Sequence, residues 1–115
     1  MIKMYGIKNC NSVQKARDWL ESKEIEYDFH DYKKQPATED FILSLVEELG
    51  WENVFKRRGM LWNKMSAEDK ENLNRETAIA RMLENNSTIN RPITVLESGE
   101  KLIAWKEEQY EEKLA

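Results

Sequence analysis

The sequence predicts an α/β fold built on a four-stranded mixed sheet, with a helical insertion between the second and third strands. Two observations support this prediction. Near the N-terminus, two strand-like segments flank one helical segment, and near the C-terminus two short apolar runs flank a Ser-Gly turn. A strand, helix, strand unit implies a parallel pair of strands, whereas a tight turn implies an antiparallel pair. The sheet should therefore contain strands of both directions.

The spacing of apolar residues defines the N-terminal elements. Residues 1–7 form an apolar run that predicts the first strand, and a helical pattern follows over residues 12–23. Aromatic and polar residues alternate over residues 26–32, which is the period of a half-buried second strand. The helix between the strands presents a mostly apolar stripe formed by Val13, Ala16, Arg17, Trp19 and Leu20.

The middle of the chain is predicted to be helical. Pro36 breaks the chain, and Thr38 is a good N-cap for a helix that ends at Gly50. Further segments are expected to follow it: a helical turn over residues 51–55, a basic loop over 56–59, a short helix capped by Ser66, and a helix over about 75–84. Together these segments make a helical insertion over about residues 38–86.

The C-terminal part of the chain predicts a hairpin and a final helix. Apolar runs at residues 92–96 and 102–105 are the third and fourth strands, joined by a two-residue turn at Ser98-Gly99 or one that extends to Glu100. Residues 106–114 form an acidic helix. Because the sequence contains no repeat, low-complexity tract or linker, residues 1–115 are expected to form a single domain.

Composition and charge exclude several classes of protein. The net charge is −4, so we expect no nucleic-acid partner, since nucleic-acid binding needs a basic surface. No apolar run approaches the roughly 18 residues of a membrane span, and the N-terminus lacks a signal-peptide pattern, so we expect no membrane association. A single cysteine forms no internal disulfide, which favours a cytoplasmic location. One histidine makes no metal site, so no metal is expected.

The single cysteine, Cys10, lies between the predicted first strand and first helix. The unpaired N–H groups and the positive dipole end of a helix stabilise a thiolate, which is the reactive form of cysteine. Lys8 is placed to add positive charge, and Asn9, Asn11 and Ser12 are placed to donate to the sulfur or to cap the helix. A lone cysteine is more often a small buried hydrophobe, but this position favours a reactive thiol.

The order of the predicted elements is that of thioredoxin-like domains, and several motifs extend the likeness along the whole chain. These motifs are Tyr5-Gly6-Ile7-Lys8-Asn9-Cys10, Lys15-Ala16-Arg17, Trp19-Leu20, His30-Asp31-Tyr32, Arg58-Gly59 with Trp62, and Arg91-Pro92. Together they resemble the glutaredoxin-coupled arsenate reductase (ArsC) family, whose superfamily includes the Spx transcriptional regulators. The likeness is closest to short YffB-like proteins, which have been proposed to be glutathione-dependent thiol reductases.

The resemblance implies roles for individual residues. Cys10 would be the catalytic nucleophile, and Arg58, or less favourably Arg57, would supply a catalytic arginine from the insertion. Arg91 would be the arginine that precedes a cis-proline, Pro92, packed against the cysteine. Guanidinium groups bind oxyanions and carboxylates with paired donors. Two of them near a helix N-terminus would lower the pKa of the thiol and hold an anionic substrate.

Two departures from the family pattern bear on function. Arsenate reductases carry a third arginine near the last strand and helix, whereas no arginine follows Arg91 here and Lys106 is the nearest charge. Spx-type switches carry Cys-x-x-Cys, whereas Val13 occupies the fourth position here. A lone cysteine leaves its oxidised form to be resolved by an external thiol. The first departure weakens the case for arsenate reduction, and the second weakens the case for an internal disulfide switch.

The function predicted from the sequence is that of a glutathione-dependent thiol oxidoreductase that acts on a small anionic or disulfide substrate. Glutathione would be the co-substrate, with glutathione or glutaredoxin as the reducing partner, and we expect a monomer. Two alternatives stay open. The first is an Spx-like, non-enzymatic regulator that binds a protein partner such as RNA polymerase, and the second is a true arsenate reductase.

Overall fold

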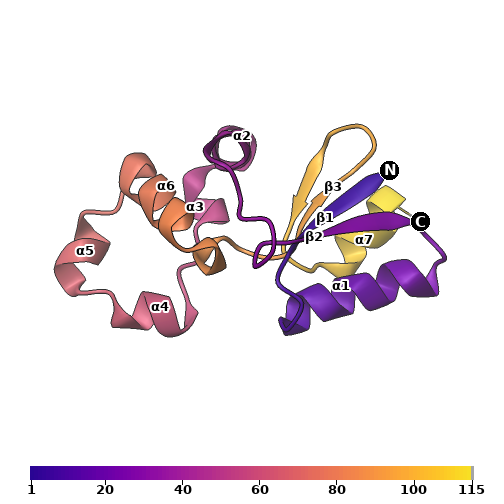
Figure 1. The fold of residues 1–115 in the computed structure, drawn as a ribbon, viewed down its shortest axis with the longest axis horizontal. Helices are drawn as coiled ribbons and strands as arrows, with labels where there is room; N and C mark the ends of the chain where they lie inside the picture. The colour runs from indigo at the N-terminus through magenta and orange to yellow at the C-terminus, as the bar shows by residue number, and fades with distance from the viewer. Residues whose placement is uncertain (115) are drawn as a thin grey trace. The chain divides into compact units, whose positions relative to one another are not determined.

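The computed structural model describes residues 1–114 and divides them into two units. The sheet unit consists of Met1–Pro36 together with the chain from Arg91 onward, and the helical unit consists of Ala37–Asn90. All four strands belong to the sheet unit (Figure 1). The predicted insertion of about residues 38–86 falls within the helical unit.

The sheet unit contains a four-stranded mixed sheet in the order β2-β1-β3-β4. The pair β1 and β2 is parallel, whereas β1 pairs with β3, and β3 with β4, in antiparallel fashion. This arrangement confirms the predicted fold class. The elements of the unit are β1 (Ile2–Gly6), α1 (Asn11–Ser22), β2 (Tyr27–Asp31), β3 (Ile93–Val95), β4 (Lys101–Ile103) and α7 (Glu107–Leu114).

Two helices cover one face of this sheet. Met4 of β1 is fully buried and packs in one cluster with Val13 and Leu20 of α1 and with Tyr110 of α7. Figure 1 shows α1 and α7 on the same side of the strands. Helix α1 and strand β1 approach each other closely at Gly6. A Cβ placed on this glycine would lie only 2.8 Å from Cγ2 of Val13. The apolar stripe of the first helix therefore forms the core of the sheet unit.

The hairpin between β3 and β4 differs from the prediction. Val95 pairs with Lys101, and the N–H of Leu96 donates to the carbonyl oxygen of Glu100 at 2.8 Å. The loop therefore consists of residues 97–99, and it begins one residue earlier than either predicted turn, Ser98-Gly99 or its extension to Glu100. Gly99 has a φ of 93°, which is the left-handed conformation that closes three-residue hairpin loops.

The helical unit is built from short helices with polar caps. Thr38 Oγ1 accepts a hydrogen bond from the N–H of Phe41 at 3.1 Å, and Ser66 Oγ accepts one from the N–H of Asp69 at 3.0 Å. Both caps were predicted, because short hydroxyl side chains satisfy the free N–H groups of a first turn. The elements are α2 (Glu39–Leu49), α3 (Trp51–Val54), α4 (Gly59–Lys64), α5 (Ala67–Glu71), α6 (Arg75–Glu84) and the 3-10 turn η1 (Asn86–Thr88).

Helix α4 was not predicted. The sequence suggested a basic loop over residues 56–59, but Gly59 is the first residue of this helix and Arg58 is its N-cap. Trp62 of α4 packs its ring against the edge of Phe55, with ring centroids 6.5 Å apart. A helix of six residues has little intrinsic stability, so tertiary packing accounts for its formation.

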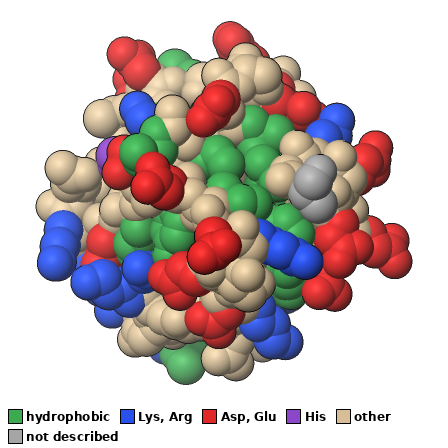
Figure 2. Space-filling model, turned by 90° about the vertical axis from the view of Figure 1, so that its right-hand side faces the viewer, with side chains coloured by type: hydrophobic (Ala, Val, Ile, Leu, Met, Phe, Trp, Pro, Cys, Tyr) green, Lys and Arg blue, Asp and Glu red, His purple; other side chains and the backbone are tan. Residues whose placement is uncertain are grey.

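The surface of the protein is strongly charged. Figure 2 shows one face, on which acidic and basic side chains surround a group of hydrophobic ones. Within residues 1–114, no helix is both long and apolar enough to cross a membrane.

Candidate active site at Cys10

Cys10 lies just beyond the carboxyl end of β1, where it is the N-cap of α1. Its backbone is extended, with φ −123° and ψ 125°, and its carbonyl oxygen accepts the first helical hydrogen bond from Gln14 at 2.9 Å. Asn11 and Ser12 are the first two helical residues, so the cap position predicted for them belongs to Cys10 instead. A side chain at the N-cap is directed at the free N–H groups of the first turn. The helix therefore presents its positive end to the sulfur.

Opposing effects act on the thiol of Cys10. Burial alone would raise the pKa of this half-buried group, but three stabilising contributions outweigh it. The backbone N–H of Val13, the side chain of Arg91 through hydrogen bonding and charge, and the backbone N–H of Ser12 together hold the pKa below its ordinary value. Each of these groups favours the charged form of the sulfur. The pKa is shifted in the direction expected of a reactive thiol, and the role of Cys10 as nucleophile stays a prediction.

Arg91 reaches the cysteine because of the way β3 pairs with β1. These strands are antiparallel, with Tyr5 opposite Ile93, so the start of β3 lies beside the carboxyl end of β1. The Arg91–Pro92 peptide bond is cis, as predicted, and Pro92 is buried. The carbonyl oxygen of Pro92 accepts a hydrogen bond from the N–H of Ala104 at 2.9 Å, which ties this segment to the chain beyond β4.

Tyr32 lies at the same end of the sheet, on the other side of β1. Its N–H donates to the carbonyl oxygen of Gly6 at 2.9 Å, one step beyond the last parallel pair of Gly6 with Asp31. The side chain is only 4% exposed, and its hydroxyl has no hydrogen-bond partner among the described residues. Burial, and then the nearby Tyr5, raise the pKa of Tyr32, whereas the charge of Arg91 lowers it. Arg91 therefore acts on both the sulfur and this hydroxyl.

Sequence reasoning included Tyr32 in a family motif but did not name it as a site residue. The information was present in the strand pattern, because a residue that follows a parallel strand lies at the carboxyl edge of the sheet. The neighbouring aromatic residues belong to the same region: Tyr5 stacks on His30 with ring centroids 4.5 Å apart and lies 6.4 Å from the ring of Tyr32.

The other predicted residues near the cysteine lie on the surface. Lys8, Asn9 and Asn11 are exposed, and Ser12 is half-buried. The carbonyl oxygen of Lys8 accepts a hydrogen bond from Nε2 of Gln14 at 2.7 Å, which ties the loop before Cys10 to the first turn of α1. This contact gives Lys8 a structural link to the helix through its backbone.

Arg58 belongs to the helical unit, where it is exposed at the N-cap of α4. Its neighbour Arg57 is exposed as well. The role of Arg58 at the cysteine stays a prediction. Within residues 1–114, no three His, Cys, Asp or Glu side chains are grouped as metal ligands.

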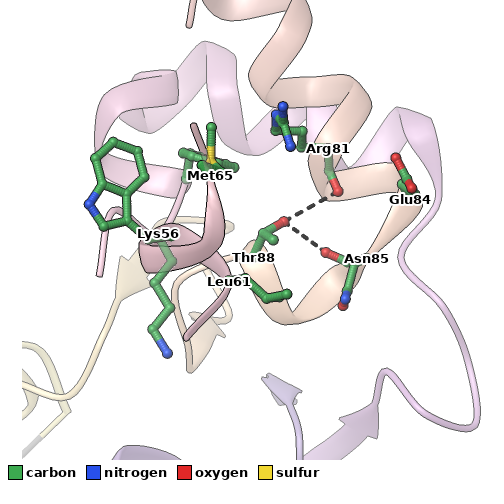
Figure 3. Close-up of a pocket in the computed structure, with 9 residues that line it drawn as sticks. Lys56, Leu61, Met65, Arg81, Glu84, Asn85 and Thr88 are labelled. Carbon is green, nitrogen blue, oxygen red and sulfur yellow. Dashed lines mark hydrogen bonds between the residues drawn. The ribbon is translucent and has the colours of Figure 1, made fainter. Parts of the chain in front are cut away.

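The helical unit has a pocket of its own, with a volume of about 150 Å³ (Figure 3). Its wall includes Thr88, whose hydroxyl donates to the carbonyl oxygens of Asn85 at 2.7 Å and Arg81 at 3.4 Å. The guanidinium of Arg81 already pairs with Asp69 at 3.3 Å. None of the residues predicted to act at the cysteine lines this pocket, whose other lining residues include Phe55, Leu61, Trp62 and Met65.

The fold and the site define the class of protein: a thioredoxin-like sheet with an activated thiol at the N-terminus of its first helix. Residues 5–113 match the ArsC family, and the chain belongs to that family.

Solved structures and curated relatives place the chain within this family more closely. A structure of a protein named YFFB is 36% identical, covers all of both chains and superimposes with a TM-score of 0.93. The structure of an arsenate reductase related protein from Brucella melitensis is 33% identical over 97% of this chain and 92% of that one, with a TM-score of 0.81. The global transcriptional regulator Spx of Streptococcus agalactiae is 27% identical over 95% of this chain and 80% of its own length.

Proposed function

We propose that the protein is a glutathione-dependent thiol reductase with Cys10 as its nucleophile. The observation that carries this proposal is the lowered pKa of Cys10, since the amides of α1 and the Arg91 side chain stabilise its thiolate. Thiolate is the nucleophilic form of cysteine, so the site favours attack on an oxidised sulfur at neutral pH. Membership of the ArsC family supports thiol chemistry at this position.

The proposed cycle has two balanced steps. The Cys10 thiolate attacks the glutathione sulfur of a mixed disulfide, forms a Cys10–glutathione disulfide, and releases the substrate thiolate, which takes a proton from solvent. A second glutathione thiolate then attacks the glutathione sulfur of this adduct, releases Cys10 as thiolate and leaves as glutathione disulfide. The second thiol must be external, because Cys10 is the only cysteine of the chain.

Mass spectrometry after incubation with glutathione disulfide tests the first step. We expect one glutathione adduct, located at Cys10, and none in Cys10→Ser. Turnover is tested by supplying a glutathionylated peptide with glutathione and following the glutathione disulfide produced through glutathione reductase. A wild-type protein that forms no adduct under conditions in which its thiol reacts with iodoacetamide would refute the proposal.

A second candidate function is binding of a protein partner without catalysis. The observation that favours it is the similarity to Spx regulators over most of their length. The single cysteine argues against a redox-gated version, because no internal disulfide can form. Binding of purified RNA polymerase that persists in Cys10→Ser, together with no glutathione turnover, would favour this candidate over the reductase.

A further inference from the structure

Tyr32 carries a buried hydroxyl at the carboxyl end of β1, beside the candidate site. This hydroxyl is screened from solvent and lacks a hydrogen-bond partner among the described residues. Leaving a buried donor unsatisfied costs free energy that replacing tyrosine with phenylalanine would avoid. The other buried tyrosine, Tyr110, shows the usual arrangement, because its hydroxyl pairs with Oγ1 of Thr94 at 2.5 Å. An unpaired buried donor at the edge of a site indicates a partner that arrives with the ligand.

Arg91 connects this hydroxyl to the cysteine. The charge of Arg91 acts on the Tyr32 phenol and on the Cys10 sulfur, so its guanidinium lies near both groups. The backbone explains this proximity. Tyr32 follows β2, which pairs with β1 on one side, and Arg91 precedes β3, which pairs with β1 on the other side. Both residues therefore lie at the carboxyl end of β1, from which the chain continues to Cys10.

Disulfide formation changes the charge balance of this site. In the free protein Arg91 favours the thiolate form of Cys10 through a hydrogen bond and through its charge. When Cys10 forms a mixed disulfide, the thiolate charge beside Arg91 is lost, and a carboxylate of the bound thiol would restore a negative charge there. Carboxylates are the anions that a planar guanidinium binds best, through paired donors. The hydroxyl of Tyr32 is screened from solvent in the free protein, so binding a carboxylate would require movement of the side chains that cover it.

We infer that Tyr32 is a specificity-determining residue, whose hydroxyl joins Arg91 in binding a carboxylate of glutathione in the Cys10 mixed disulfide. This inference rests on the proposed function and adds the chemical feature by which the site selects its thiol. Because burial keeps the phenol protonated, it acts as a donor and suits an acceptor-only carboxylate. A thiol without a carboxylate would gain nothing from it.

Redox titration of Cys10 in two thiol buffers tests this inference. Glutathione with glutathione disulfide carries carboxylates, whereas 2-mercaptoethanol with hydroxyethyl disulfide carries none, and mass spectrometry measures the fraction of each adduct at equilibrium. In Tyr32→Phe, we expect the equilibrium constant for the glutathione adduct to fall about tenfold, the effect of one charge-assisted hydrogen bond. The constant for the mercaptoethanol adduct should not change.

Two controls separate binding from folding. Tyr27→Phe removes a hydroxyl from β2, the strand that precedes Tyr32, and should change neither constant, because the Tyr27 hydroxyl contacts Arg17 and Glu21 instead. The free energy of unfolding of Tyr32→Phe should be unchanged or higher, since the lost hydroxyl has no partner among the described residues.

The remaining outcomes are distinguishable. If Tyr32→Phe lowers the equilibrium constants of both adducts equally, Tyr32 acts through the cysteine itself. If it does not lower the constant for the glutathione adduct, Tyr32 has no role in binding glutathione. Either result overturns the inference. A glutathione adduct in the wild type that is no more stable than the mercaptoethanol adduct also overturns it, while the proposed function stands. Absence of any glutathione adduct in the wild type refutes both.

Discussion

At the scale of single residues, the chemistry of this protein depends on the neighbours of one sulfur atom. Burial disfavours the Cys10 thiolate, and the amides of Val13 and Ser12 together with Arg91 reverse that effect. Arg91 is the only one of these contributions that comes from a side chain, so it is the one that mutation can remove. It is supplied by the segment before β3, far from Cys10 in sequence.

Arg91→Ala should therefore raise the pKa of Cys10 toward its ordinary value. The pH dependence of iodoacetamide alkylation measures this pKa, and the wild-type midpoint should lie below that of free cysteine. Arg91→Lys should recover only part of the shift, because a point charge does not reproduce a planar fork. Identical midpoints for wild type and Arg91→Ala would show that the helix amides alone activate the thiol.

Tyr110 predicts how stability depends on alkaline pH. Burial raises the pKa of Tyr110 to about 12, with the Thr94 hydrogen bond acting in the opposite direction. A raised folded-state pKa means that the unfolded protein loses its proton first. This contribution to stability is therefore complete below about pH 10, the ordinary value, and is lost as the pH rises toward 12.

Chemical denaturation between pH 8 and pH 12 checks this prediction against Tyr110→Phe. The variant should be less stable than the wild type at pH 8 by about 1 kcal/mol, because Thr94 loses its partner. Its stability should also decline less steeply above pH 10. Parallel declines for the two proteins would show that Tyr110 does not control the alkaline transition.

At the scale of elements, the site depends on the close contact between β1 and α1. Gly6 is the last residue of β1, and Val13 lies in the first turn of α1, so this contact sets the distance between the strand and the helix N-terminus. The chain between them contains Cys10. A change in this packing should therefore move the sulfur relative to Arg91.

Gly6→Ala should lower both stability and thiol activation. The added Cβ would lie 2.8 Å from Cγ2 of Val13, which is too close unless the Val13 side chain or the backbone shifts. We expect a loss of about 1–3 kcal/mol in the free energy of unfolding, as for other overpacked cores. The pKa of Cys10, measured by alkylation, should rise.

The double variant Gly6→Ala with Val13→Ala provides the control. Removing the Val13 methyl groups opens space for the new Cβ, so the two changes should be less destabilising together than the sum of their separate effects. Strict additivity would show that the clash at Gly6 is relieved elsewhere.

At the scale of the whole molecule, the predicted site residues are divided between the two units. The sheet unit holds Cys10, Arg91 and Tyr32, whereas Arg58 belongs to the helical unit. We propose on the family resemblance that Arg58 serves the same reaction. Arg57 is its adjacent, equally charged and exposed neighbour, which gives a matched control.

Arg58→Ala should lower the rate of Cys10 glutathionylation about tenfold or more, the effect of one lost charge-assisted contact. Arg57→Ala has the same change of net charge and should react nearly as the wild type does. Stopped-flow measurement with glutathione disulfide compares the two. A larger loss of rate in Arg57→Ala than in Arg58→Ala would assign the role to Arg57. Similar small losses in both variants would show that neither arginine takes part in the reaction.

Arsenate reduction should be weak or absent, even with glutathione and glutaredoxin supplied. The arsenate enzymes that the sequence resembles use three arginines, but no arginine follows Arg91 in this chain. Lys106 is exposed and lacks the bidentate fork that suits a tetrahedral oxyanion. Disulfide chemistry creates no multiply charged oxyanion and needs fewer cations. If the wild type produces arsenite at a high rate and Cys10→Ser produces none, the protein is a true arsenate reductase and our proposal is wrong.

The sequence alone determined the order of the strands and the long helices, and it predicted Cys10 as the nucleophile. Apolar periodicity predicted all four strands and the long helices, because burial on one face imposes a period on the chain. The turn position of Cys10 predicted an activated thiol, because a helix N-terminus stabilises an anion whatever packs around it. These are local properties, and local sequence specifies them.

Only the tertiary structure decided which distant groups meet the sulfur. Strand pairing brings Arg91 and Tyr32 to the two sides of the carboxyl end of β1. The spacing of residues along the sequence does not specify this strand register. Helix α4 and the three-residue hairpin loop escaped prediction for the same reason, since the first depends on the packing of Trp62 on Phe55 and the second on the pairing of Val95 with Lys101. Long-range contacts select among conformations that local propensity leaves nearly equal in free energy.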